Sequence, residues 1–270
     1  MAKSRIVLVL DNSNSMYGSV ENNMWRPNNK MEVVKATASG IAEGVLSGNS
    51  GSIAMVVFGS DLIDSTGFWG SGEIQEFRHY LEQIDRYGRY VGAEDPGGTN
   101  LQIGLYTATN MLARFSGQGE HRAIVLFADG EPTYSYRLRS AEAVAGGYRF
   151  TACDMCCKVG SGYCYELGHH RYRVRLQRNW FSSGVLVNDN GIATLWQAEQ
   201  AMTHGIHIYT VFMGGNSRAA QIASQISVSG ECFAIGDNLQ SQEKIERTVA
   251  AVLSGIDTRG KGELINEDGN

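Results

Sequence analysis

The sequence lacks any apolar run that approaches the 18 residues of a membrane-spanning helix, so we expect no membrane span. The N-terminal stretch MAKSRIVLVLD is not a signal peptide, because its apolar run is short and no small-residue cleavage site follows. We expect either a domain cut from a longer chain or a complete cytosolic protein. Basic residues are also few: 23 Lys and Arg against 28 Asp and Glu give a net charge of −5, which argues against nucleic acid as a partner.

The common catalytic motifs are absent as well. The chain has no P-loop, no GxGxxG in a strand-to-helix turn, no GxSxG and no HExxH. Its six histidines are scattered, and none neighbours Asp11 or Asp129, the two acidic residues singled out below. We therefore expect a protein that is not an enzyme.

Apolar strands and amphipathic helices alternate along most of the chain. Hydrophobic residues make up 43% of the sequence and charged residues 19%, which is enough for a sizeable core. The predicted strands lie at 4–10, 52–60, 61–66, 122–130, 206–214 and 232–236, and the predicted helices at 30–46, 73–87, 99–115, 196–205, 218–227 and 239–255. This alternation predicts an α/β fold with a doubly wound, mostly parallel six-stranded sheet flanked by helices.

The alternation breaks between residues 132 and 190. This segment holds nine of the 25 aromatic residues, four of the five cysteines, and eight Lys or Arg against four Asp or Glu. A structureless loop of this length is unusual inside a compact domain. We therefore expect residues 1–256 to form one domain, interrupted at 132–190 by a small cysteine-rich insertion with its own core. Residues 257–270 are expected to be a polar tail or linker.

Short oxygen-bearing side chains follow the predicted strands. Asp11, Ser13 and Ser15 stand at the end of the first strand, Thr99 follows a Gly-Gly pair, and Asp129 follows the strand IVLFA. In doubly wound sheets, ligands bind beyond the carboxyl ends of the strands. Five oxygen groups with two formal charges suit a hard divalent cation. The alternative is that the aspartate and serines only form an Asx-turn or helix cap.

The motif DNSNS, a Thr after Gly-Gly, and Asp-Gly after an apolar strand together resemble the von Willebrand factor A domain and its metal-ion-dependent adhesion site, as in bacterial pilus and surface adhesins. The resemblance covers residues 4–131 and about 191–256. It implies that Ser13, Ser15 and Thr99 bind Mg²⁺ or Mn²⁺ directly, while Asp11 and Asp129 act through water. It also implies the strand order 3-2-1-4-5-6, with the short third strand antiparallel.

The function expected from this resemblance is metal-dependent adhesion, in which the cation binds an acidic group of a protein ligand. The ligand would be a host extracellular-matrix or cell-surface protein, and the domain would be a monomer on the surface or pilus of a bacterium. The alternative is an intracellular A domain in the cytoplasm that serves as an adaptor for an ATPase or a metal-insertion complex.

Candidate ligand contacts lie on the loop after DNSNS, beside Asp129 and in the insertion. They are Trp25, Arg26, Glu131, Arg171, Tyr172, Arg173 and Trp180. Tyr, Trp and Arg are favoured at protein-binding hot spots. Alternatively, Glu131 is only a solvated residue, and the aromatic residues pack the core of the insertion.

The cysteines of the insertion form a cluster, namely Cys153, Cys156, Cys157 and Cys164. We expect disulfides that tie an irregular segment with little core, which would require an oxidising compartment. The first alternative is zinc, because Cys153 and Cys156 have C-x2-C spacing and Cys164 with His169 or His170 would complete four ligands. Free thiols are the second. Cys232 is expected to be a buried, reduced thiol.

Overall fold

The structure is a computed structural model of the 270-residue chain. It describes ten segments, and all structural statements below refer to them. They are residues 3–17, 30–48, 51–84, 97–115, 120–144, 147–159, 189–214, 217–227, 232–235 and 242–265. None of the helices in these segments is long and apolar enough to cross a membrane.

A six-stranded sheet forms the centre of the molecule, with the strand order β3-β2-β1-β4-β7-β8. Its strands are β1 (Lys3–Asp11), β2 (Gly51–Phe58), β3 (Leu62–Ser65), β4 (Glu120–Ala128), β7 (His207–Phe212) and β8 (Cys232–Ala234). Neighbouring strands run parallel except β3, which pairs antiparallel with β2 at one edge. The expected order and the antiparallel short strand are both confirmed.

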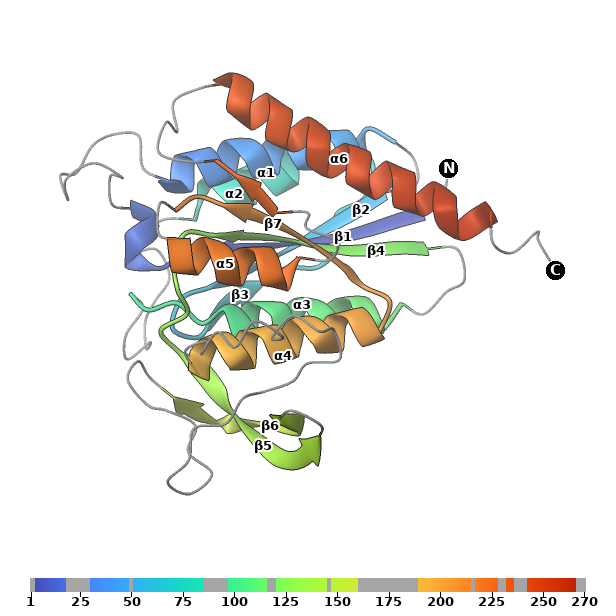
Figure 1. The fold of residues 1–270 in the computed structure, drawn as a ribbon. Helices are drawn as coiled ribbons and strands as arrows, with labels where there is room; N and C mark the ends of the chain where they lie inside the picture. The colour runs from blue at the N-terminus through green and yellow to red at the C-terminus, as the bar shows by residue number, and fades with distance from the viewer. Residues whose placement is uncertain are drawn as a thin grey trace.

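Helices cover both faces of the sheet, in the three-layer arrangement of Figure 1. The layer on one face consists of α1 (Lys30–Leu46), α2 (Ile74–Glu82) and α6 (Gln242–Ile265). The layer on the other face consists of α3 (Leu101–Ala113), α4 (Asp189–Thr203) and α5 (Ser217–Ile226). The predicted α/β fold class is therefore confirmed.

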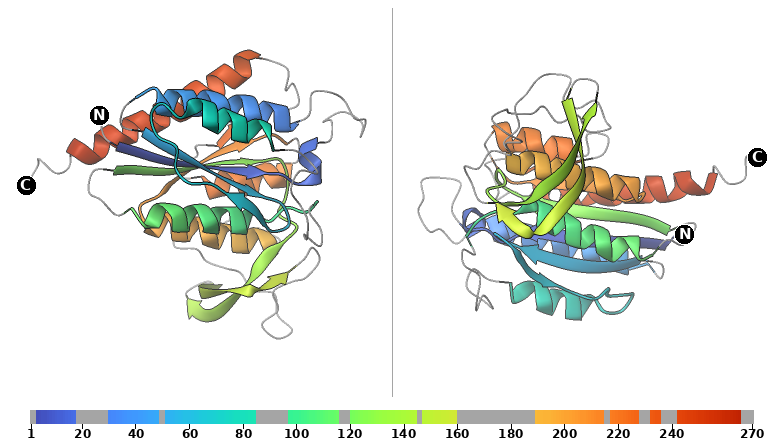
Figure 2. Two further views of the ribbon diagram at one scale, coloured as in Figure 1. Left: turned by 180° about the vertical axis from the view of Figure 1, so that it is seen from behind. Right: turned by 90° about the horizontal axis from the view of Figure 1, so that it is seen from below.

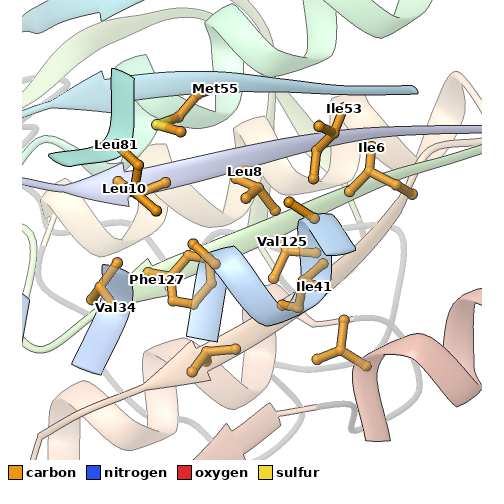
Figure 3. Packing of buried hydrophobic residues seen from close by; sticks show 14 of the residues in the cluster. Ile6, Leu8, Leu10, Val34, Ile41, Ile53, Met55, Leu81, Val125 and Phe127 are labelled. Carbon is orange, nitrogen blue, oxygen red and sulfur yellow. The ribbon is translucent and has the colours of Figure 1, made fainter. Parts of the chain in front are cut away.

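The residues of β1 alternate between the two cores. Ile6, Leu8 and Leu10 are fully buried against the layer of α1, α2 and α6, as Figure 3 shows for that cluster. Val7 and Val9 are fully buried in the second core, which includes α3 and α4. Because side chains point to opposite faces at successive positions, a strand covered on both faces is apolar throughout.

The described part of the insertion is a β-hairpin of β5 (Ser135–Val144) and β6 (Gly147–Val159), which packs outside α3 and α4 (Figure 2). Tyr136, Leu138 and Phe150 are buried in the same core as α3 and α4. The indole N–H of Trp196 on α4 also donates to the Phe150 carbonyl, at 2.8 Å. The separate core expected for the insertion is therefore not found in its described part, because the hairpin is held by the helices of the main domain.

The end of the chain also differs from the expectation. Residues 257–265, expected to belong to a polar tail, are the last turns of α6. An α-helix satisfies its own backbone hydrogen bonds, so it can continue in a polar sequence without a surface to pack against. In Figure 1, the end of α6 extends past the edge of the sheet.

Candidate metal centre

Three loops meet at the edge of the sheet where the parallel strands end, on the left in Figure 1. Asp11 is the last residue of β1, and Asp129 follows the neighbouring strand β4 directly. Thr99 lies just before α3. The N–H of Asn14 donates to the Gly97 carbonyl at 3.2 Å, which joins the first loop to the loop of Thr99. We call this group of loops the rim.

Four of the predicted ligands form a continuous chain of hydrogen bonds. The Ser13 N–H donates to Asp11 Oδ1 at 2.8 Å, and the short 3₁₀ helix η1 (Asn14–Tyr17) then turns the chain. The hydroxyls of Ser13 and Ser15 lie 3.0 Å apart. The Ser15 hydroxyl donates to Asp129 Oδ1 at 2.8 Å. The bond from Ser13 to Asp11 is an Asx-turn, so the turn and the gathering of oxygen atoms are present together.

Thr99 is fixed at the rim by its neighbour. Asn100 caps α3, because its side-chain oxygen accepts from the Ile103 N–H at 3.2 Å. The Asn100 N–H donates to the Gly59 carbonyl at 2.7 Å, which ties the start of α3 to the end of β2. Thr99 itself is only 5% exposed. The sheet and the helix thus determine together where the backbone of Thr99 lies.

Asp11 is the electrostatically unusual residue of the rim. It is fully buried, and its Oδ2 atom has no hydrogen-bond partner within the part of the chain that the structure describes. Burial, and after it the negative charge of Asp129, raise the pKa of Asp11 to about 8. Asp11 has an unpartnered carboxylate oxygen, and a second carboxylate lies nearby. This position therefore favours a bound positive charge.

Residues 6–131 match the family model of the von Willebrand factor type A domain. The fold is that of a von Willebrand factor A domain. The comparison with curated proteins finds no significant match.

Three solved structures illustrate the similarity, which at these levels of identity concerns the fold. The pilus adhesin SpaC from Lactobacillus rhamnosus GG has 21% identity and a TM-score of 0.62 over 98% of this chain and 31% of its own. The pilus adhesin RrgA from Streptococcus pneumoniae has 15% identity and a TM-score of 0.60 over 91% of this chain and 44% of its own. The vWF domain of the pili tip protein Mfa5 from Porphyromonas gingivalis has 16% identity and a TM-score of 0.58, over 94% of this chain and 96% of its own. This chain thus spans less than half the length of SpaC or RrgA.

The side chains at the rim fit a hard divalent cation. Carboxylate and hydroxyl oxygens are the donors that Mg²⁺ and Mn²⁺ prefer, and the unpartnered Oδ2 of Asp11 is the kind of atom that a cation or its water satisfies. Among the described residues, no group of three or more His, Cys, Asp or Glu side chains is placed to hold a metal. A metal at the rim would therefore depend on the hydroxyls as well as the carboxylates.

Lys30 belongs to the rim, although the sequence did not indicate it. It is the first residue of α1, and its ammonium group forms an ion pair with Asp129 Oδ2. The Lys30 side chain is 13% exposed and the Asp129 side chain is fully buried. A positive charge already stands beside one of the two carboxylates. No local motif marks this contact, because 99 residues separate the partners.

Of the predicted ligand contacts, one is described. Glu131 is partly exposed, two residues after Asp129, and so lies at the rim. The other six lie outside the described residues, namely Trp25, Arg26, Arg171, Tyr172, Arg173 and Trp180. Their proposed contacts stay predictions.

Cys153 and Cys156 lie on β6 and form no disulfide in the described structure. Cys153 is partly buried and accepts a hydrogen bond from Gln102 Nε2 at 3.2 Å, so it packs against α3. The side chain of Cys157 and the other candidates for a disulfide or zinc site, Cys164, His169 and His170, lie outside the described residues. The expected disulfides are thus not confirmed. Cys232 is a free thiol, as expected, but only partly buried.

Proposed function

We propose that this A domain is a binding module that attaches to an acidic group of a protein ligand through a divalent cation held at the rim. The observation that carries the proposal is the hydrogen-bonded chain of Asp11, Ser13, Ser15 and Asp129 at the carboxyl ends of two parallel strands. The loop of Thr99 is joined to this chain by the hydrogen bond from the Asn14 N–H to the Gly97 carbonyl. The similarity to pilus adhesins supports a role on a bacterial surface or pilus.

Each part of the rim has a distinct task in this proposal. The hydroxyls of Ser13, Ser15 and Thr99 would hold Mg²⁺ or Mn²⁺, and Asp11 and Asp129 would supply negative charge behind them. A carboxylate of the partner could then complete the coordination shell of the bound cation. Two carboxylates leave a divalent ion with few negative ligands, which favours an acidic group from outside. Neutral hydroxyl ligands thus favour binding of an acidic partner.

The test is binding of the purified chain to immobilised extracellular-matrix proteins, measured by surface plasmon resonance in Mg²⁺ and again in EDTA. We expect EDTA and Thr99→Ala each to remove most of the specific signal, because the contact depends on the cation. Thr203→Ala is the matched control, because Thr203 is exposed on α4 and its hydroxyl donates to the Gln200 carbonyl of the same helix. Binding that survives EDTA unchanged would contradict the metal-dependent mechanism.

The second candidate is an intracellular adaptor for an ATPase or a metal-insertion complex. The observation that favours it is that Cys153 and Cys156 are free thiols in the described part of the chain, since thiols persist in reducing compartments. Thiol titration of the denatured protein from its native source separates the two candidates. Five reactive thiols, the number of cysteines in the chain, would favour the intracellular function, and fewer would favour the surface function.

A further inference from the structure

The backbone of Thr99 is bonded to the segment that leads from Asp129 into the insertion. The Thr99 N–H donates to the hydroxyl of Thr133 at 2.9 Å. In return, the Thr99 carbonyl accepts from the N–H groups of Thr133 at 2.8 Å and Tyr134 at 3.0 Å. Both polar groups of the Thr99 backbone are therefore satisfied by one dipeptide, Thr133–Tyr134, which directly precedes β5.

The Thr99 loop and the Thr133–Tyr134 dipeptide are also in close contact at Gly98. A Cβ atom at Gly98 would lie 2.2 Å from Cε2 of the Tyr134 ring and 3.2 Å from the Thr133 hydroxyl. Distances below 3.0 Å are not tolerated, so the ring can lie here only because residue 98 is glycine. Gly98, the second glycine before Thr99, thus permits a close approach of the Thr99 loop to the insertion.

The hairpin is itself fastened to the main domain just beyond this contact. The Tyr136 hydroxyl donates to Asp61 Oδ1 at 2.7 Å, and the Tyr136 N–H donates to Gln102 Oε1 at 2.6 Å. The Lys158 ammonium lies 3.5 Å from Asp61 Oδ2. Because both strands of the hairpin are held near the Thr99 loop, Thr133 and Tyr134 have little freedom to move away from it.

We propose that Thr133 is a positioning residue for Thr99, and that the first residues of the insertion are therefore a working part of the metal centre. The proposal rests on the proposed function, in which the Thr99 hydroxyl is a metal ligand. Asn100 fixes the chain on one side of Thr99, and the Thr133 hydroxyl fixes the amide on the other. Without the Thr133 hydroxyl, the Thr99 amide loses its acceptor and the side chain is less well oriented toward the cation.

The experiment measures Mn²⁺ binding to the whole chain by isothermal titration calorimetry, with no protein ligand. Thr133→Val keeps the shape of the side chain and removes the acceptor. We expect it to weaken Mn²⁺ binding roughly five- to tenfold, which is the size of one hydrogen bond, while Thr133→Ser restores the wild-type affinity. The amide of Thr99 should also exchange its hydrogen roughly five to ten times faster in metal-free Thr133→Val than in the wild type.

Thr66→Val is the matched control. The Thr66 hydroxyl accepts from a backbone N–H at the same distance, 2.9 Å, but the donor is Met55 in β2. We expect this variant to lower the melting temperature as much as Thr133→Val does and to leave Mn²⁺ affinity unchanged. Wild-type affinity in Thr133→Val, or equal weakening in Thr66→Val, would overturn the positioning role alone. A wild-type chain that does not bind Mn²⁺ would overturn the proposed function together with it.

Discussion

Asp11 shows at the scale of a single residue why the rim favours a cation. One carboxylate oxygen is used in the turn to Ser13, and the other lacks a hydrogen-bond partner within the described structure. Leaving a buried carboxylate oxygen unsatisfied is costly, and Asp129 adds a second negative charge. Lys30 compensates only in part, because its ammonium group contacts Asp129. The ammonium and a metal ion would therefore compete for the same carboxylate.

Replacing Lys30 with Met tests this competition. Since a positive charge beside Asp129 repels a second cation, we expect Lys30→Met to tighten Mn²⁺ binding by roughly tenfold, an order of magnitude typical of partly buried charges a few ångströms apart. Isothermal titration calorimetry with Mn²⁺ measures the change. Lys35→Met is the control, because it removes the same charge from the same helix, where Lys35 bonds to the Glu82 carbonyl away from the rim. Weaker binding in Lys30→Met would show that the lysine supports the site instead.

The rim residues differ in how far the sequence alone predicts them. Asp11, Ser13 and Ser15 form a local motif, and strand ends in a parallel sheet bring Asp129 to the same edge. Lys30 could not be found in this way, because its contact with Asp129 depends on the direction in which α1 begins. The bonds from Thr133 to Thr99 also depend on tertiary structure, although Thr133 lies only four residues after Asp129.

At the scale of an element, the hairpin is the part of the fold that the sequence analysis missed. Its signal was present: Tyr136 and Leu138 are buried while Arg137 and Arg139 are exposed, which is the period of a strand with one covered face. A Gly-Gly pair at 146–147 is also typical of a hairpin. The strand period is harder to recognise in β6, because three extra residues of this strand, 155–157, interrupt the pairing of β6 with β5.

The thiols of β6 should differ in reactivity. Burial raises the pKa of Cys153 from its ordinary 9.0 to about 11, so its thiolate fraction near neutral pH is roughly a hundred times smaller than that of an ordinary thiol. Cys156 is exposed. We expect brief treatment with iodoacetamide to label Cys156 and spare Cys153, as measured by peptide mass spectrometry. In denaturant, which removes the burial, both should be labelled equally.

Equal labelling in the folded protein would contradict the packing of Cys153 against α3. A disulfide at either position would block labelling even in denaturant, until a reductant is added. That outcome would support the disulfide expected from the sequence and, with it, an oxidising compartment. The same measurement therefore tests the packing of the hairpin and its redox state.

At the scale of the whole molecule, the fold followed from the alternation of apolar strands and amphipathic helices. Strands buried on both faces and joined by helices form a parallel sheet, and that sheet fixed the edge at which polar loops gather. The last turns of α6 could not be predicted from the sequence, because residues 257–265 have no apolar period that distinguishes a helix from a tail.

The candidate metal ligands belong to neither hydrophobic core. The centres of β1, β2 and β4 are fully buried in the two cores, and the candidate metal ligands lie in loops beyond the strands or at their last residue. Removing the metal should therefore leave the fold intact, while adding it should stabilise the folded state by mass action. At a Mn²⁺ concentration of 100 times the dissociation constant, this stabilisation is about 2.7 kcal/mol. For a domain of this size, it corresponds to a rise in melting temperature of roughly 5 to 10 °C.

Asp11→Ala separates the cation from the fold. We expect the variant to keep the circular dichroism spectrum of the wild type. The substitution removes a carboxyl group whose charged form is destabilised by burial. Its melting temperature should not change with Mn²⁺, since the rim would lose one of its two carboxylates. Thermal unfolding of both proteins with Mn²⁺ and with EDTA measures this difference. A variant that unfolds without metal would show that Asp11 supports the fold, and an equal Mn²⁺ response in both proteins would place the cation somewhere other than the rim.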